Sequence, residues 1–229
     1  MKTKTSGLNC FLKGLLCFFA LGYDFLQGFI DKLIFGDAVA DNFFDSPWFV
    51  LVTHWIFVII VWTITAFLLI KWINKNSNQQ LLQLKWNSSL TYLIPCAIIA
   101  SVALAYLEQL IDPAMIPQIY REFLNFKADH GSMGIVVSVA QNVYYVVESC
   151  LVLLLIILMQ LAGESWFKKR NIPWGAIGLL LTWGLGHLTH GGLATLWICM
   201  FALFAGVFYL LAKRHVVPSY IIILLIFII

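Results

Sequence analysis

Charged residues are scarce in this chain. Only 11% of its 229 residues are Asp, Glu, Lys or Arg, whereas a typical soluble domain has about 25%. Hydrophobic residues make up 62% of the chain, and its mean hydropathy is +0.91. So little charge leaves too few polar side chains to cover a soluble globular surface, and the composition therefore predicts an integral membrane protein.

Other patterns are also missing, and each absence excludes a class of function. No basic run is interleaved with aromatic residues, and the net charge of +3 is dispersed along the chain, which excludes nucleic acid as a partner. The five cysteines include no Cys-x-x-Cys pair, so we interpret them as small buried hydrophobic residues rather than disulfides or zinc ligands. Without an internal repeat or a low-complexity tract, residues 1–229 are predicted to form a single integral membrane domain.

Apolar stretches recur along the whole chain. Crossing a bilayer takes about 20 apolar residues in a helix, and seven stretches approach or exceed this length, the last being short. They cover residues 8–30, 48–73, 89–111, 134–162, 173–189, 194–212 and 216–229. The predicted fold class is all-α, a polytopic transmembrane helical bundle with about seven spans.

Basic residues in the connections predict the orientation, because cytoplasmic loops retain Lys and Arg. They follow every second stretch: Lys71, Lys75 and Lys85, then Lys168, Lys169 and Arg170, then Lys213 and Arg214. We expect a multi-pass protein of the cell membrane with a cytoplasmic N-terminus, an outer C-terminus and lipids as partners. The first stretch resembles a signal peptide, but Lys13 interrupts it and no clear cleavage site follows, so we interpret it as an uncleaved span.

Two segments on the predicted outer side are more than simple connections. Apolar residues recur at helical spacing over 115–126, which predicts a helix lying in the membrane interface. An Asp-rich connection precedes residue 48, but its spacing lacks the pattern of a calcium-binding loop.

A polar stripe interrupts the fourth stretch. Its members are spaced at i, i+3, i+4 and i+7, which places them on one helix face; they are Gln141, Tyr144, Tyr145 and Glu148. An ionised carboxylate near the bilayer centre costs roughly 2.5–3.5 kcal/mol even on lenient scales. Glu148 is therefore expected to face the protein interior and to have a partner there.

Two histidines at the end of the fifth stretch, one of them just beyond it, are the predicted partners of Glu148. Trp183, His187 and His190 are spaced at i, i+4 and i+7, and glycines at 175, 178, 184 and 186 would let the two helices approach closely. The short basic turn between the stretches predicts that they are neighbours. By contrast, we interpret Lys13 and Asp24 as charges at the ends of the first span, and His54 as an isolated structural or solvated residue.

Three roles are open for Glu148, His187 and His190. Glu148 could act as a general base toward water. The three side chains could instead bind a divalent metal such as zinc, whose bound water would be the nucleophile. Alternatively, Glu148 could accept a hydrogen bond from a histidine or tyrosine only to satisfy its own polarity.

The C-terminal third of the chain resembles a known family, the CPBP intramembrane proteases, also called CAAX prenyl protease and bacteriocin-processing or Abi proteins. The family has a Glu-Glu-x-x-x-Arg motif on one helix and Phe-x-x-x-His on the next. Glu148 matches the first motif, although Ser149 and Leu153 replace its second Glu and its Arg. Trp183 and His187 match the second, with Trp in place of Phe.

Residues 204–219 are similar to the family's stretch leading into its last helix. Glu164 is a second possible match to the first motif. No histidine follows residue 218, so the family's third motif is missing unless His190 substitutes for it. The resemblance implies a CPBP-like core over residues 134–229.

The resemblance also implies a function. We expect an intramembrane protease that hydrolyses a membrane-associated peptide or protein substrate, with Glu148, His187 and His190 as catalytic residues, or a degenerate relative of such an enzyme. The alternatives are a non-catalytic bacteriocin-immunity or membrane interaction protein on the same fold, and a small transporter in which the stripe ending at Glu148 lines a path.

Overall fold

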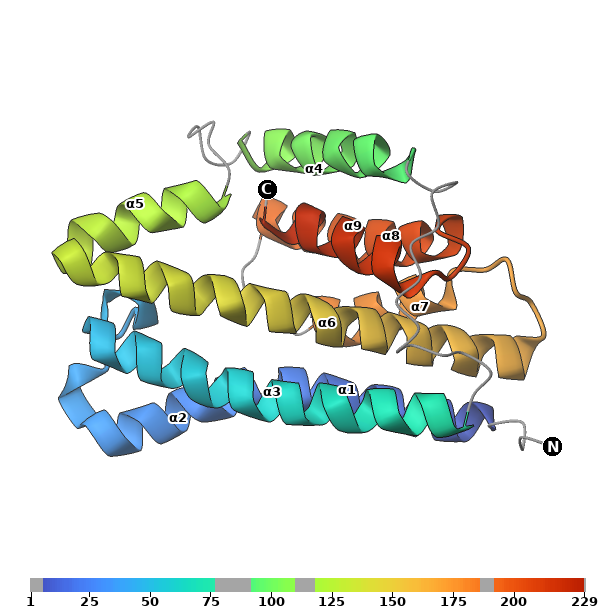
Figure 1. Cartoon of the computed structure of the whole chain (residues 1–229), viewed down its shortest axis with the longest axis horizontal. Helices are drawn as coiled ribbons and strands as arrows, with labels where there is room; N and C mark the ends of the chain where they lie inside the picture. The colour runs from blue at the N-terminus through green and yellow to red at the C-terminus, as the bar shows by residue number, and fades with distance from the viewer. Residues whose placement is uncertain (1–5, 77–91, 110–117, 186–191, 229) are drawn as a thin grey trace.

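The computed structural model describes residues 6–76, 92–109, 118–185 and 192–228. Every regular element within these ranges is a helix, which confirms the all-α prediction. The long helices run along the long axis of the molecule in Figure 1, side by side. The fold is therefore a helical bundle.

Helix α6 (Gly134–Phe167) is the central element of the bundle. Its 34 residues span about 51 Å at 1.5 Å per residue. Each residue from Leu151 to Gln160 is buried, so this part of the helix is covered on every side. A helix that is apolar all round is expected to be buried, and α6 contacts α1, α3, α5, α7 and α9 in Figure 1.

The predicted first span is a pair of consecutive helices. Helix α1 (Gly7–Leu21) packs along α6, and the Cys17 thiol donates to the Leu151 carbonyl at 3.2 Å. Helix α2 (Tyr23–Phe35) packs mainly on α3 (Trp48–Asn76). The chain leaves α2 at Gly36, whose φ of +57° is a left-handed conformation that glycine adopts readily. The 3-10 turns η1 (Gly36–Ala38) and η2 (Phe43–Asp45) complete the Asp-rich connection.

Three segments within the described ranges are long and apolar enough to cross a membrane, so seven spans are not confirmed. They are Gly7–Ala38, Trp48–Asn76 and Gln118–Phe167. The remaining predicted spans correspond to α4 (Leu93–Gln109), to α7 (Trp174–Leu179) continued by the π-helical turn η5 (Leu180–Gly184), to α8 (Gly192–Leu211) and to α9 (Val216–Ile228). A helix needs about 20 residues to cross a bilayer core of about 30 Å. Helices α4 and α9 are shorter than this, with 17 and 13 residues.

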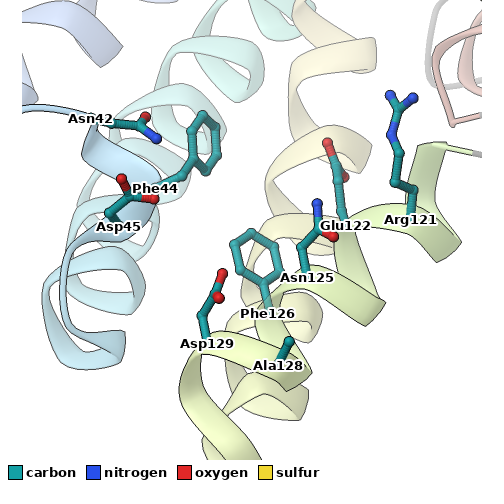
Figure 2. Close-up of a pocket in the computed structure, with 9 residues that line it drawn as sticks. All are labelled: Asn42, Phe44, Asp45, Arg121, Glu122, Asn125, Phe126, Ala128 and Asp129. Atoms are coloured by element: carbon teal, nitrogen blue, oxygen red, sulfur yellow. The ribbon is translucent and has the colours of Figure 1, made fainter. Parts of the chain in front are cut away.

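Helix α5 (Gln118–His130) contains residues 118–126 of the segment predicted to be an interfacial helix, and residues 115–117 lie outside the described ranges. The turn η4 (Gly131–Met133) folds α5 back onto the start of α6, where Phe126 is buried. A groove of about 510 Å³ opens between η2 and α5. Figure 2 shows carboxylates and aromatic rings on both sides of it, including Asp45 and Asp129.

The predicted contact between the fourth and fifth stretches is confirmed, because α7 packs on α6. Gln160 is buried in α6, and its amide donates to the Ile172 carbonyl at 3.0 Å and accepts from the Gly175 amide at 2.9 Å. A Cβ on Gly175 would lie 2.6 Å from the Ile156 carbonyl oxygen. The absence of a side chain at 175 thus permits the close approach of the two helices.

The five cysteines are free thiols. Cys10 and Cys17 are buried, and Cys150 and Cys199 are half-buried, but Cys96 is exposed. The expectation of uniform burial is therefore wrong for Cys96.

We predict that Gly206→Leu destabilises the fold by about 1–3 kcal/mol or more. A Cβ at Gly206 would collide with the Ala176 backbone, so α8 and α7 would have to separate. Gly28→Leu is the matched control, because nothing lies within 4 Å of a Cβ at that position. Thermal unfolding of the two detergent-purified variants tests this; equal melting temperatures would contradict the close packing of α7 and α8.

Candidate functional site

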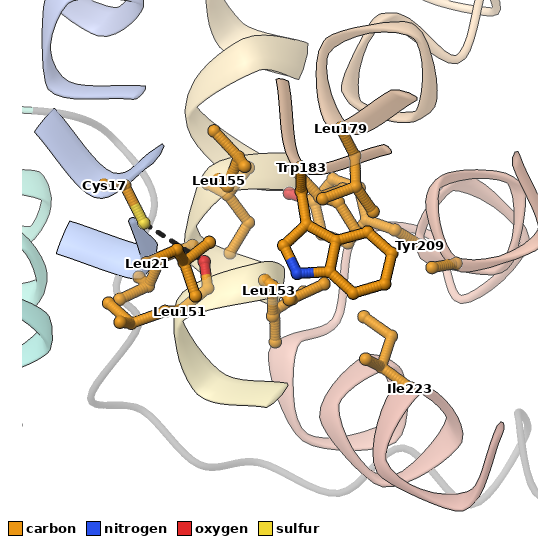
Figure 3. Packing of buried hydrophobic residues seen from close by; sticks show 14 of the residues in the cluster. Cys17, Leu21, Leu151, Leu153, Leu155, Leu179, Trp183, Tyr209 and Ile223 are labelled. Carbon is orange, nitrogen blue, oxygen red and sulfur yellow. Dashed lines mark hydrogen bonds between the residues drawn. The ribbon is translucent and has the colours of Figure 1, made fainter. Parts of the chain in front are cut away.

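Glu148 lies in the interior and is bonded to a residue of the next helical segment along the chain. Its side chain belongs to the middle of α6 and is 6% exposed. The Trp183 indole Nε1 in η5 donates to Glu148 Oε1 at 3.3 Å. Figure 3 shows Trp183 within the core, close to Leu179, Leu153 and Tyr209. Glu148 and Trp183, which belong to two separate motifs in the sequence, are therefore in direct contact in the structure.

A small cavity lies beside this pair. Its volume is about 60 Å³, enough for one or two water molecules. The polar residues that line it are Asp24, Tyr144, Glu148 and Trp183, and Trp62 and Phe18 are among the apolar ones. A water molecule in this cavity would have several hydrogen-bonding groups within reach, as a buried water requires.

The predicted polar stripe of α6 divides into two parts. Tyr144 and Glu148 face the cavity, and the Trp62 ring packs against Tyr144 with 4.7 Å between centroids. The Tyr145 hydroxyl instead donates to Glu122 of α5 at 2.8 Å and accepts from the Gln141 amide at 3.0 Å. The residues of the stripe therefore have two different environments, the cavity for Tyr144 and Glu148 and helix α5 for Tyr145.

His54 forms the second polar cluster of the interior. Its Nδ1 lies 2.5 Å from Asp31 Oδ2, and its Nε2 lies 2.9 Å from Asp24 Oδ1. The His54 and Asp31 residues are 4% and 0% exposed. The interpretation of His54 as isolated and of Asp24 as a boundary charge is therefore wrong.

Helix α2 supports this cluster along one face. The Tyr23 hydroxyl donates to the Gln27 carbonyl oxygen at 2.7 Å, and the Gln27 amide donates to Asp31 Oδ1 at 2.8 Å. These residues recur every four positions, so they lie one above another on the helix. This spacing, together with a histidine in the apolar helix α3, is the signal that sequence reasoning missed.

The other two predicted site residues, His187 and His190, lie outside the described residues. Of the predicted metal ligands, Glu148 alone can therefore be placed. Within the described ranges no group of three or more His, Cys, Asp or Glu side chains could hold a metal ion. Zinc binding by Glu148, His187 and His190 stays a prediction.

Glu164, the alternative match to the acidic motif, has a different environment. The Arg214 guanidinium donates to its Oε1 at 2.5 Å, and Arg170 Nε lies 3.7 Å from its Oε2. Gln160 donates to the same carboxylate at 2.8 Å. Sixteen residues separate Glu164 from Glu148, about 24 Å along the helix. Glu164 thus connects the ends of α6 and α8 rather than contributing to the cavity.

No protein-family model, curated protein or solved structure matches this chain. The family resemblance therefore depends on the motif residues themselves.

We predict that His54→Leu lowers stability by about 3–5 kcal/mol, since it leaves buried carboxylates without their partner. Asp31 contributes most to this loss, because its side chain is fully buried whereas that of Asp24 is 30% exposed. The measurement is thermal unfolding of the purified variants. Adding Asp31→Asn and Asp24→Asn to His54→Leu removes both carboxylate charges and is expected to restore much of the lost stability. A triple variant no more stable than His54→Leu would show that unpaired carboxylates are not the cause of the loss.

Proposed function

We propose that this chain is a membrane-embedded hydrolase of the CPBP type, in which Glu148 activates water to cleave a membrane-associated peptide. The observation that carries the proposal is the contact between Glu148 and Trp183. It brings together the two helical segments whose residues match the family's acidic and aromatic-histidine motifs. The predicted His187 follows Trp183 by four residues.

The surroundings of Glu148 suit a general base. Its Oε1 accepts from the Trp183 indole, and the carboxylate lines a cavity of water-molecule size. Burial of a carboxylate costs free energy, which favours a functional role for Glu148. No arginine or lysine lines the cavity wall among the described residues.

The chemistry is the addition of water to a peptide carbonyl. Glu148 takes one proton from water while the water oxygen bonds to the carbonyl carbon. The C–N bond then breaks, and Glu148 returns the proton to the leaving nitrogen. The products are a carboxylic acid and an amine, and the glutamate is regenerated. Such acid–base assistance contributes roughly 100-fold to 10,000-fold to a rate.

A non-catalytic immunity or membrane interaction protein is the second candidate function. The Ser149 hydroxyl, at the position of the family's second Glu, is buried and has no hydrogen-bond partner among the described residues. Leu153, at the position of the family's Arg, is packed in the core. Both positions have lost the family's charge, which favours a degenerate site. The transporter alternative receives less support, because the polar stripe divides between two sides of α6.

The proposal includes a location in the cell membrane, with a cytoplasmic N-terminus and an outer C-terminus. The apolar helices support membrane association. The start of α1, the end of α3 and the turn between α6 and α7 lie at the same end of the bundle (Figure 1). That end is basic, with Lys75, Lys168, Lys169 and Arg170, which favours the cytoplasmic side.

We predict that Glu148→Gln abolishes proteolysis, because the amide cannot take a proton from water. The probe is the set of new protein termini, measured by mass spectrometry in membranes of cells producing the wild-type or variant chain. Termini that depend on the wild-type chain should fall by about 100-fold or more with Glu148→Gln.

Glu164→Gln is the matched control on the same helix. It removes the alternative motif glutamate, and the termini should persist. Identical termini with the wild-type chain and Glu148→Gln would overturn the hydrolase. Protection against a bacteriocin that survives Glu148→Gln would then identify the immunity function, and loss of the termini with Glu164→Gln alone would move the site to the other end of α6.

A further inference from the structure

Asp24 reaches the Glu148 cavity from another part of the chain. It lies in the first turn of α2, directly after the break between α1 and α2 at Gly22. Asp24, Tyr144 and Glu148 are the titratable residues lining the cavity among the described residues. The fold therefore brings together two carboxyl groups that are separated by 124 residues of sequence.

We propose that Asp24 is the second acid–base group of the Glu148 site. This inference rests on the proposed hydrolytic function, and it adds a residue from the N-terminal third of the chain to a site otherwise built from α6 and η5. The two carboxyls share one proton across the cavity, because like charges in a poorly hydrated space oppose a double negative charge.

His54 and Asp31 hold Asp24 in position. The imidazole faces a carboxylate oxygen with each ring nitrogen, at 2.5 Å for Asp31 and 2.9 Å for Asp24. Asp31 is in turn fixed by Gln27, so the anchor is buried and hydrogen-bonded. The Phe43 ring of η2 packs on the imidazole, with 4.5 Å between centroids. His54 acts through Asp24 and is a positioning residue.

The environments of the two carboxyls differ, as a paired acid–base mechanism needs. Asp24 has an imidazole beside it, whereas Glu148 has the neutral indole of Trp183. The Asp24 side chain also keeps 30% of its surface exposed, while that of Asp31 has none. Asp24 therefore lines the cavity and is also partly exposed at the surface of the bundle. Asp31 is fully buried and only holds His54 in place.

The pair divides the proton transfers of one hydrolysis. The ionised carboxylate takes a proton from water as the water oxygen bonds to the peptide carbonyl carbon. The protonated carboxyl gives its proton to the carbonyl oxygen, forming a neutral tetrahedral intermediate. Collapse of that intermediate breaks the C–N bond: its hydroxyl proton returns to one carboxylate, and the other carboxyl protonates the leaving nitrogen. The pair again holds one proton.

A purely structural role for Asp24 makes a different prediction. If Asp24 served only to bond His54, the amide of Asp24→Asn would still offer hydrogen-bonding groups to the imidazole. The protonation of Glu148 would then be independent of residue 24. Coupling between the two carboxyls therefore distinguishes the shared-proton pair from a structural contact.

The experiment measures cleavage and coupling separately. Cleavage is measured by the protein termini in membranes, where Asp24→Asn should reduce the chain-dependent termini by about 100-fold. Coupling is measured with a hydrophobic carbodiimide, which reacts with protonated carboxyls and adds its own mass to the modified residue. At a pH somewhat above neutral, carbodiimide labelling of Glu148 should fall by roughly tenfold in Asp24→Asn, because the neighbouring negative charge is gone.

Asp37→Asn is the matched control, an exposed aspartate in η1 close by in sequence, and should change neither readout. Asp24→Ser is measured in the same way should the Asp24→Asn protein fail to accumulate. Unchanged Glu148 labelling in both variants overturns the pair, even if the termini are lost. Retention of the termini in Asp24→Asn also overturns it.

Failure of the proposed function has a separate signature. If Glu148→Gln leaves the termini unchanged, the hydrolase is wrong, and the carbodiimide result alone decides whether Asp24 and Glu148 share a proton. Reduced labelling in Asp24→Asn then supports a coupled pair in a non-hydrolytic protein, and unchanged labelling removes it.

Discussion

A carboxylate held away from water needs a hydrogen-bonding partner, and the interior of this bundle is arranged around that requirement. Glu148 has the Trp183 indole, Asp31 has His54 and Gln27, and Glu164 has Arg214. Each partner comes from a different helix or from one helical turn away. The three acidic residues therefore connect α2, α3, η5 and the end of α8 to their neighbours, while the apolar residues of α6 supply the packing between these connections.

Much of the fold could be predicted from the sequence, because hydrophobic length is a direct measure of membrane helices. The predicted stretches coincide with helices wherever the structure describes them, and α3 is close to the predicted length. The number of spans was not predictable with the same certainty. Helices α4 and α9, with 17 and 13 residues, were both counted as candidate spans from their apolar sequence. Whether such short helices cross the bilayer depends on their packing and tilt, which the length of an apolar stretch does not give.

The site was predicted only in part, for a physical reason. Helical periodicity places residues on a face, so Glu148 was correctly expected to be buried and to face protein. Periodicity says nothing about which distant helix covers that face. The approach of Asp24 and the pairing of His54 with Asp31 depend on how α2 and α3 pack, and both contacts join residues far apart in the sequence.

The π-helical turn η5 determines the direction of Trp183. A turn of this kind contains one residue more than an α-helical turn, and the Thr182 hydroxyl of η5 donates to the Gly178 carbonyl of α7 at 2.7 Å. Loss of a single residue from η5 would return it to an ordinary α-helical turn and change the direction in which Trp183 points from α7. The length of η5 therefore decides whether the indole of Trp183 meets the carboxylate of Glu148, and a deletion within this turn would break that hydrogen bond even with every side chain of the pair unchanged.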